Sequence, residues 1–473
     1  MSLLLWFRND IRIHDNPALD YFLQQHQSSE MAKAIFFVSE KQWLAHDWSA
    51  IKIDFIKRHV NALAEQLLSL NITLEVVHCD DFSAQTSYLK QYCQQHNITE
   101  VIANQEIEFN EQQRDAAFIA QGVPLRMFES DVIVKKGQVL NKTNEMYKVF
   151  TPYKRAWLSY VKQHGFSYLG KPSSVLSASQ IEEKKQNLVA PLDCVGTSDS
   201  WPLAEQVEQQ VIPDFYQYKV ANYANKRDFP AIKATSGLSP YLAIGAISPR
   251  YLLMLFLQRF PDILVASDSE EFTWLNELIW REFYRNLIFH RQDLSKHACF
   301  NPKYSAVKWP NNKTLFAQWC EGKTGYPLVD AAMRQLNQTG WMHNRLRMVV
   351  AMFLTKHLQI DWRLGEAYFY SQLADADLAS NNGGWQWSAS TGVDAVPYFR
   401  IFNPYRQAER FDPKGDFVRK YVKELAAIEG KAIHQPSKLI ANQYSYPMPI
   451  VDLKIAAEHT KALFKNLNTS PVA

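Results

Sequence analysis

The chain has 473 residues, with 51 lysine and arginine against 48 aspartate and glutamate residues, and 13% of its residues are aromatic. Its 47% hydrophobic and 21% charged residues are typical of a globular protein, and they exclude a disordered, collagen-like or disulfide-stabilised chain. The five cysteines form no C-x-x-C pair and have no histidine partners at zinc spacing, so we expect a reduced, cytoplasmic protein without a metal site. No stretch approaches the roughly 18 apolar residues of a membrane-spanning helix.

Short apolar runs alternate with helical patterns over the first part of the chain, which predicts a doubly wound parallel α/β domain over residues 1–130. The five expected strands are Leu3–Phe7, Ala34–Val38, Thr73–His78, Glu100–Ala103 and Pro124–Phe128. Helix-like stretches between them include Ala50–Leu70 and Glu111–Gln121. No G-x-G-x-x-G follows the first strand, so we expect any nucleotide cofactor to bind elsewhere.

The rest of the chain divides into a connector and a helical domain. Residues 171–200 contain six serines and no aromatic residue, as expected of an exposed segment, and we place the connector at 131–200. From Trp201 the periodicity is helical, as in Trp274–Phe289 and Leu346–Leu358. This pattern predicts a large all-α domain over 201–473.

Tryptophan and positive charge are concentrated in the same part of the helical domain. Eight of the 13 tryptophans lie between positions 274 and 387, and Trp274–Arg410 holds 16 basic and 11 acidic residues, a net +5. This combination suits a surface that contacts phosphates and stacks bases. The alternative is a tryptophan-rich core with a solvated basic face.

Two segments of the helical domain have residues suited to a ligand. Glu277, Trp280 and Arg281 share one helical stripe, which suits a planar ligand such as a base or a flavin ring, although a surface Glu–Arg pair on an amphipathic helix is the alternative. Thr235–Ser239 clusters hydroxyls with a glycine before a helix start and could bind a phosphate, unless it is an ordinary N-cap.

The densest polar and aromatic segment is Asp375–Trp387. Asp375 and Asp377 are two residues apart, which favours a loop or a helix start, and Asn381–Gly384 predicts a turn. Two nearby arginines, at 345 and 347, lie in an apolar helical region and need an acidic partner, for which either aspartate would serve. No histidine or cysteine is near the two aspartates, which disfavours a metal site.

These motifs resemble, in order and spacing, the photolyase/cryptochrome family, with the closest resemblance to bacterial class I cyclobutane pyrimidine dimer photolyases. The matching segments are Leu5–Arg12, Thr235–Ser239, Trp274–Tyr284, Thr324–Pro327, Gly340–Met348 and Asp375–Trp387. The resemblance implies an α/β antenna domain joined by a long connector to a helical FAD domain. It also implies a monomeric enzyme that binds double-stranded DNA and splits a flipped-out dimer with an electron from excited, reduced FAD.

The resemblance also implies site residues. FAD would be held by Tyr223, Thr235, Ser236, Gly237, Leu238, Ser239, Trp274, Glu277, Arg281, Trp341, Asn344, Arg347, Asp375, Asp377 and Asn381. In that site Arg347 would pair with Asp375 beside the isoalloxazine ring, and Asn381 would face its N5 atom. Electrons would reach the flavin from the surface through Trp309, Trp362 and Trp385.

At the lesion, Trp280 and Trp387 would form the walls of the dimer cavity. The residues that would bond or pack against the bases are Glu277, Asn344 and Met348, and those that would hold flanking phosphates are Arg345, Arg400 and Arg406. Six-four enzymes of the family carry histidines at positions 344 and 348, so that substrate is disfavoured. A cryptochrome-like blue-light photoreceptor without repair activity is the alternative function.

The family's folate-type members bind methenyltetrahydrofolate as an antenna. The matching residues in this chain are His46, Asn110, Glu111 and Lys296. Ser295 stands where a close relative has cysteine, and a deazaflavin antenna, or none, is the alternative.

Overall fold

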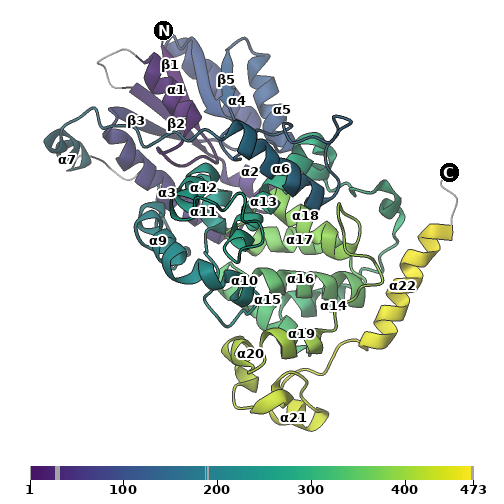
Figure 1. Ribbon diagram of the computed structural model, residues 1–473. Coiled ribbons are helices and arrows are strands. Elements are labelled where there is room, and N and C mark those ends of the chain that lie inside the picture. Colours follow the sequence, from purple (N-terminus) through teal and green to yellow (C-terminus); the bar gives the residue numbers. More distant parts are fainter. Residues whose placement is uncertain (1, 27–31, 187, 189–190, 470–473) are drawn as a thin grey trace.

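Five apolar runs of the N-terminal part form one parallel sheet (Figure 1). The computed structural model describes residues 2–26, 32–186, 188 and 191–469. The sheet has the order β3-β2-β1-β4-β5 and consists of β1 (Leu3–Phe7), β2 (Ala32–Val38), β3 (Ile72–His78), β4 (Glu100–Asn104) and β5 (Leu125–Phe128). This sheet, followed by a helical region, confirms the predicted fold class.

The central strand β1 is buried on both faces, which explains its uninterrupted apolar sequence. Its alternate residues Leu3, Leu5 and Phe7 share a core with α1 (Pro17–Gln25) and α3 (Ala50–Leu68). Leu4 and Trp6 point the other way, toward α4 (Phe82–Gln95) and α5 (Phe109–Ile119). A short helix α2 (Glu40–Ala45) follows β2.

The chain leaves β1 toward β2 on one side and reaches β4 on the other side, so the strand order reverses at β1. In an open α/β sheet, ligands bind outside the carboxyl ends of the strands at such a point. Arg8, which follows β1, forms an ion pair with Asp115 of α5 at 2.8 Å. Asn104, at the end of β4, donates to Asp10 and, at 2.7 Å, to Asn16. These contacts fix a polar rim at this edge of the sheet.

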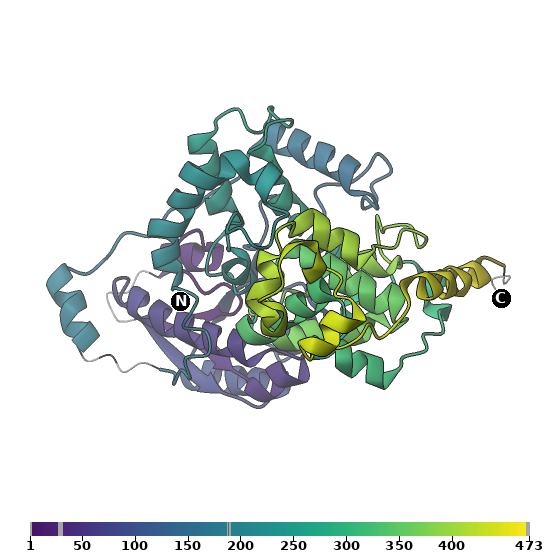
Figure 2. The same ribbon diagram turned by 90° about the horizontal axis from the view of Figure 1, so that it is seen from below.

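The first half of the expected connector packs on the helical region. This half contains α6 (Phe150–His164). It is bound by Glu282 of α13 (Phe272–His290). The Glu282 carboxylate accepts hydrogen bonds from the backbone of Ile133 and Val134, at 2.8 and 2.9 Å, and from the Trp157 indole of α6, at 2.8 Å. In contrast, α7 (Ala178–Gln186) has no buried residue and lies at one side of the molecule (Figure 2). The domain boundaries themselves stay a prediction.

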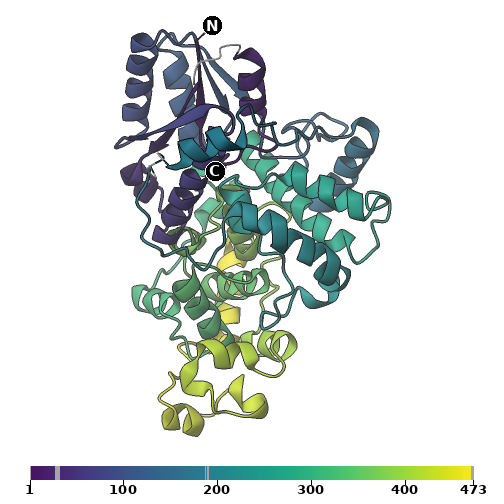
Figure 3. The same cartoon turned by 90° about the vertical axis from the view of Figure 1, so that its left-hand side faces the viewer.

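The remaining described chain is helical and forms the lower part of the molecule in Figure 3. The longer helices are α12 (Pro249–Arg259), α13, α14 (Lys313–Cys320), α15 (Pro327–Thr339), α16 (Asn344–Met352), α17 (Trp362–Gln372), α18 (Leu378–Ala389), α19 (Pro404–Phe411) and α22 (Leu453–Thr469). Shorter α-helices are α8 (Ala204–Gln206), α9 (Ile212–Asp214), α10 (Tyr223–Lys226), α11 (Ser239–Ala243), α20 (Asp416–Tyr421) and α21 (Lys438–Gln443). The π-helical and 3-10 turns are η1 (Val207–Val211), η2 (Phe215–Lys219), η3 (Val220–Asn222), η4 (Gln292–Lys296), η5 (Pro302–Ala306), η6 (Phe353–His357), η7 (Lys423–Leu425) and η8 (Gly430–Ile433).

The helical region contacts the carboxyl edge of the sheet directly at Gly245. Gly245 has a φ of +65°, and a Cβ atom at this position would overlap the carbonyl oxygen of Asn9. The Arg12 guanidinium donates to the Gly245 carbonyl at 2.7 Å. One buried apolar cluster also includes side chains from both regions, such as Phe22 and Ile279. The two regions are therefore held in one arrangement.

The described residues contain no helix that is both long and apolar enough to span a membrane. Within the same ranges, no group of three His, Cys, Asp or Glu side chains could hold a metal ion. All five cysteines are free thiols.

Candidate functional site

Four helices bring several of the expected flavin residues together: α13 contacts α10 and α18, and α16 contacts α18. Glu277 of α13 forms an ion pair with Arg227, which follows α10. The Arg227 guanidinium also lies 5.8 Å from the ring centroid of Tyr223. Burial raises the pKa of Glu277, although the Arg227 charge opposes the rise. Glu277 therefore does not pair with Arg281 as in the surface-pair alternative. It pairs with Arg227 instead and links α13 to α10.

The segment Thr235–Ser239 has free polar groups. The hydroxyls of Thr235, Ser236 and Ser239 make no hydrogen bond to the described part of the chain, and no side chain caps α11. Gly237 has a φ of +69° with open space where a Cβ would stand. The ordinary N-cap interpretation is therefore wrong, because the hydroxyls do not cap the helix.

Two expected flavin residues point toward the boundary with the sheet. The Arg281 guanidinium donates to the backbone carbonyls of Asp131 and Leu242, at 2.6 and 3.4 Å. One turn later, Arg285 pairs with Asp131 and, at 2.6 Å, with Asp377. Burial opposes the charged form of Asp377, but Arg285 and Arg281 hold its pKa below the ordinary value. Asp377 also caps α18, because its carboxylate accepts from the Ser380 amide at 2.9 Å.

The two arginines of α16 have different acidic partners. Arg347 forms two hydrogen bonds with Asp375, at 2.8 and 3.0 Å, and also donates to the Met342 carbonyl. Arg345 pairs with Asp228 at 2.7 Å, and its guanidinium lies over the Phe411 ring at 4.5 Å. The structure thus contains the expected Arg347–Asp375 pair.

The turn predicted at Asn381–Gly384 is wrong, because these residues lie inside α18. The Asp377 cap starts this helix, and tertiary contacts outweigh the low helix propensity of its Asn and Gly residues. Asn382 donates to the Glu366 carboxylate at 2.8 Å. The Asn381 amide nitrogen donates to the Glu366 carbonyl at 3.1 Å, which leaves its side-chain oxygen without a donor in the described chain.

The three relay tryptophans differ in exposure. Trp362 and Trp385 are buried, and their indole N–H groups have no hydrogen-bond partner among the described residues, whereas Trp309 is half-buried. Trp385 packs edge-on against Phe369, with ring centroids 4.9 Å apart. Trp319, the tryptophan for which the sequence gives no role, is buried and donates to the Val350 carbonyl at 3.1 Å.

The expected lesion walls lie on α13 and α18. Trp280 is half-buried and stacks on Phe150 of α6, with centroids 3.6 Å apart and planes at 9°, and on Tyr284 at 5.6 Å. Trp387 is half-buried near the end of α18. Two other lesion residues lie on α16: Asn344 is exposed at its start, and the Met348 sulfur is 3.9 Å from the Arg345 guanidinium. The expected flavin residue Trp341 is half-buried just before α16. Arg400 and Arg406 are exposed and form no ion pair with the described chain.

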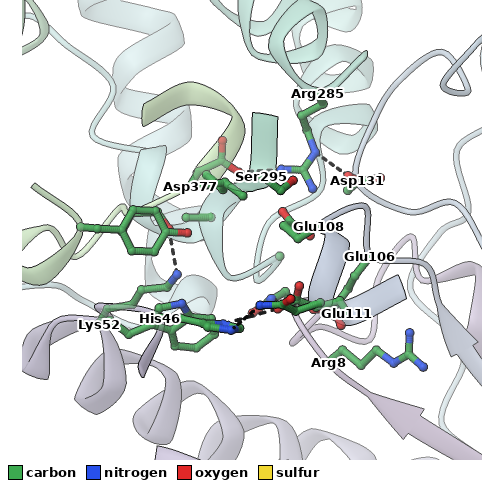
Figure 4. A pocket seen from close by; sticks show the side chains of 18 of the residues that line it. Arg8, His46, Lys52, Glu106, Glu108, Glu111, Asp131, Arg285, Ser295 and Asp377 are labelled. Atoms are coloured by element: carbon green, nitrogen blue, oxygen red, sulfur yellow. Dashed lines mark hydrogen bonds and ion pairs between the residues drawn. The ribbon is translucent and has the colours of Figure 1, made fainter. Parts of the chain in front are cut away.

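A cavity of about 390 Å³ lies between the sheet and the helical region, at the reversal of strand order (Figure 4). All four expected antenna residues line it, together with Ser295, Arg281 and Asp377. The His46 Nε2 atom accepts from the amides of Gln42 and Asn110, both at 3.0 Å, and its Nδ1 atom is 3.8 Å from the Glu111 carboxylate. The Lys296 ammonium lies 3.6 Å from the centroid of the Phe109 ring.

Charged residues that the sequence did not single out also line this cavity: Arg8, Lys52, Glu106, Glu108 and Arg285 (Figure 4). Burial, with the charges of Glu108 and Glu106, raises the pKa of Glu111 to about 8. Burial also lowers the pKa of Lys52 to about 8, and its ammonium donates to the Ala376 carbonyl at 2.8 Å. The sequence signal that could have predicted these cavity residues is the polar run Arg8-Asn9-Asp10 directly after the first strand, because strand ends at a reversal point line a ligand crevice.

Fold and site together define a two-region protein with one ligand cavity at the carboxyl edge of a parallel sheet and a second polar and aromatic site among helices. The chain belongs to the DNA photolyase family: residues 3–172 match "DNA photolyase" and residues 274–466 match "FAD binding domain of DNA photolyase". It is 43% identical to the deoxyribodipyrimidine photo-lyase of Escherichia coli (strain K12) over 468 residues, 98% of each chain. It is also 43% identical to that of Vibrio cholerae over 475 residues, 98% of this chain and 99% of the relative.

Solved structures show the same architecture. A class III photolyase from Agrobacterium tumefaciens has 33% identity and a TM-score of 0.80, covering 99% of this chain and 98% of its own. An archaeal photolyase from Sulfolobus tokodaii with two FAD molecules has 27% identity and a TM-score of 0.77, covering 98% and 100%. A cryptochrome from Synechocystis has 25% identity and a TM-score of 0.82, covering 98% and 99%. These comparisons confirm the predicted family and fold class.

Proposed function

We propose that this protein repairs cyclobutane pyrimidine dimers in double-stranded DNA by light-driven electron transfer from bound, reduced FAD. The observation that carries the proposal is the 43% identity, over 98% of the chain, to a relative named deoxyribodipyrimidine photo-lyase. A cryptochrome-like photoreceptor has weaker support, since the cryptochrome compared above is 25% identical.

The helical region fits FAD. The unpaired hydroxyls of Thr235, Ser236 and Ser239 and the open space beside Gly237 suit the phosphates of the dinucleotide. Arg347 places a cation, balanced by the buried Asp375, where the resemblance puts the isoalloxazine ring. When bound and reduced, FAD supplies a light-activated one-electron donor.

Asn381 is held as a hydrogen-bond acceptor. Because its amide nitrogen donates to the Glu366 carbonyl, its side-chain oxygen is the atom free to accept a proton donor such as a reduced flavin N5–H. The remaining proposed flavin contacts are Tyr223, Leu238, Trp274, Glu277, Arg281, Trp341, Asn344 and Asp377. Of these, Arg281 and Asp377 also line the interdomain cavity, so the two proposed ligand sites share side chains.

A dimer must leave the DNA stack to reach a flavin inside the protein, as in other enzymes that act on bases. Trp280 is a rigid wall for such a dimer, since Phe150 and Tyr284 fix its ring. Base–aromatic stacking contributes about 1–3 kcal/mol per base. We assign Trp387 to the opposite wall, and Glu277, Asn344 and Met348 to contacts with the two bases.

The unpaired guanidinium groups of Arg400 and Arg406 suit DNA phosphates. Arg345 would contact a phosphate as well, and its Asp228 partner orients the guanidinium in the free protein. Trp309, Trp362 and Trp385 would carry an electron from the surface to the flavin, in keeping with a half-buried Trp309 and two buried partners.

The interdomain cavity would hold the antenna, and methenyltetrahydrofolate is our proposed ligand. His46, Asn110, Glu111 and Lys296 surround it, and a carboxylate such as Glu111 suits the hydrogen-bond donor edge of a pterin. The Sulfolobus relative, described as holding two FAD molecules, makes a second flavin the alternative antenna. We further propose that the protein is cytoplasmic and monomeric. Its free thiols support a reducing compartment such as the cytoplasm.

The absorption spectrum of the isolated protein and a repair assay test the function. We expect flavin bands, and restoration of a dimer-containing oligonucleotide under near-ultraviolet or blue light but not in darkness. Flavin binding without repair would contradict the proposed repair activity and support the photoreceptor alternative. An additional folate band would identify a folate antenna, and a second equivalent of flavin would identify a flavin antenna. A spectrum with neither would show that the isolated protein carries neither antenna.

A further inference from the structure

Two buried polar residues end the helical segment that begins with the lesion residues. Asn344 and Met348 lie on α16, which continues directly into the π-helical turn η6. At the end of that turn, the Lys356 side chain is 0% exposed and His357 is 4% exposed. A buried ammonium is unfavourable without a partner, and π-turns inside helices occur frequently at functional sites.

Both side chains bond the same irregular segment, Val393–Asn403, which joins α18 to α19. The Lys356 ammonium donates to the Arg400 carbonyl at 3.1 Å, and the His357 Nε2–H donates to the Phe402 carbonyl at 2.9 Å. Burial lowers the pKa of Lys356 to about 7, and both of its protonation states carry an N–H donor.

In this segment the carbonyls of Arg400 and Phe402 face the interior, whereas the side chains of Phe399 and Arg400 are exposed. Val393 and Val396 are buried anchors, whereas Phe399 is 63% exposed and the Arg400 guanidinium has no partner within the described ranges. The segment contains no helix or strand that could fix its backbone. Its conformation therefore depends on contacts from its neighbours.

The C-terminal helix α22 supports the same arrangement from a second side. The Thr460 hydroxyl donates to the Lys356 carbonyl at 2.7 Å, and Phe464 stacks on Tyr398 with centroids 5.6 Å apart and planes at 8°. Lys356 thus joins three parts of the chain: the lesion helix, the Val393–Asn403 segment and α22.

We propose that Lys356 and His357 are positioning residues for DNA binding, which hold the Val393–Asn403 segment so that Arg400 and Phe399 meet the DNA backbone and bases in a preset conformation. The inference rests on the proposed function, because it takes Arg400 as a DNA contact. Without the two donors, the Arg400 and Phe402 carbonyls lose their partners and the segment gains conformations. Binding DNA would then require ordering the segment first, which weakens affinity without changing the flavin site.

The test compares dark binding of a dimer-containing oligonucleotide by wild type, Lys356→Met, His357→Leu and His357→Gln. The exposed Lys142→Met, in a part of the chain distant in sequence, controls for the loss of one positive charge. We expect affinity to fall by about tenfold in Lys356→Met and in His357→Leu, since a hydrogen bond to a buried group is lost. His357→Gln, which keeps a donor, and Lys142→Met should bind like wild type.

Three further measurements separate positioning from general destabilisation. Flavin content, photoreduction and repair yield at saturating DNA should equal those of wild type, while amide hydrogen exchange of residues 393–403 should accelerate in the weakened variants. Unchanged affinity in folded Lys356→Met and His357→Leu would overturn the inference, and so would loss of flavin in parallel with affinity. If wild type itself fails to bind dimer-containing DNA, the proposed function fails, and the DNA role of this segment fails with it.

Discussion

Gly383 offers a direct test of how α18 fits against α13. A Cβ atom at this position would lie under 3.0 Å from the ring of Tyr284, whereas a Cβ at the adjacent Gly384 would meet nothing within 4 Å. Both glycines lie inside the same helix, so Gly384→Ala is a matched control for Gly383→Ala.

The two alanine variants should differ by the overlap alone. Each replacement favours the helix by about 0.8–1.0 kcal/mol, so Gly384→Ala should stabilise the protein by roughly that amount. Gly383→Ala adds an overpacking penalty of about 1–3 kcal/mol, because Tyr284 is held in a stack on Trp280. For 473 residues, the unfolding entropy of about 1 kcal/mol per degree converts this penalty into a difference in Tm of about 1–3 °C.

Thermal unfolding followed by circular dichroism, and flavin release followed by fluorescence, would measure the difference. We expect Gly383→Ala to unfold below Gly384→Ala and to bind dimer-containing DNA more weakly, because displacement of Tyr284 disturbs the Trp280 wall. Equal melting temperatures and equal affinities for the two variants would refute the close approach of α18 to Tyr284.

The remaining predictions concern the relay, the lesion cavity and the antenna cavity. Trp385→Phe should block photoreduction of oxidised flavin, measured by transient absorption, yet spare repair by pre-reduced protein, because it removes one of the two buried indoles of the proposed relay; normal photoreduction would exclude this relay. Trp280→Ala should weaken dimer binding by about 1–3 kcal/mol in a gel-shift assay, through lost stacking. An affinity equal to that of wild type would show that Trp280 does not form a wall of the dimer cavity. Raising the pH from about 4.5 to 8 should destabilise the antenna-free protein, because the raised pKa of Glu111, about 8, means that the folded state keeps a proton that the unfolded state releases. Glu111→Gln should flatten this dependence in denaturant titrations, and an identical slope in both proteins would contradict it.

The sheet could be predicted closely from sequence because its inner strands β2, β1 and β4 are mostly buried on both faces. Such strands read as short continuous apolar runs, and the predicted Leu3–Phe7 and the observed β1 have the same bounds. The predicted Ala34–Val38 begins two residues inside the observed β2, since Lys33 interrupts the run.

Local reasoning failed where tertiary contacts decide the conformation. The Asn and Gly residues of 381–384 have low helix propensity, but the Asp377 cap and the bond from Asn382 to Glu366 hold them in α18. The partner of Arg345 was also beyond prediction, because Asp228 lies 117 residues earlier in the chain.

The cavity residues needed topology as well as sequence. Arg8 and Glu106 follow different strands, and only the order of the sheet places both strand ends at the same reversal point. Lys52 comes from α3 and contacts the carbonyl of Ala376, a pairing over 324 residues that no local pattern reveals.

The close approach of Gly245 to Asn9 has a consequence for how the two proposed chromophores communicate. No methyl group fits between the backbones there, and the Arg12 guanidinium bonds the same glycine, so the sheet and the helical region cannot slide or rotate at this contact. Excitation energy passes between pigments with an efficiency that falls steeply with their separation and changes with the angle between their transition dipoles. Because the two regions are locked at the contact of Gly245 with Asn9, folding fixes both the separation of the chromophores and the angle between their transition dipoles. Every molecule would then transfer captured light with the same efficiency.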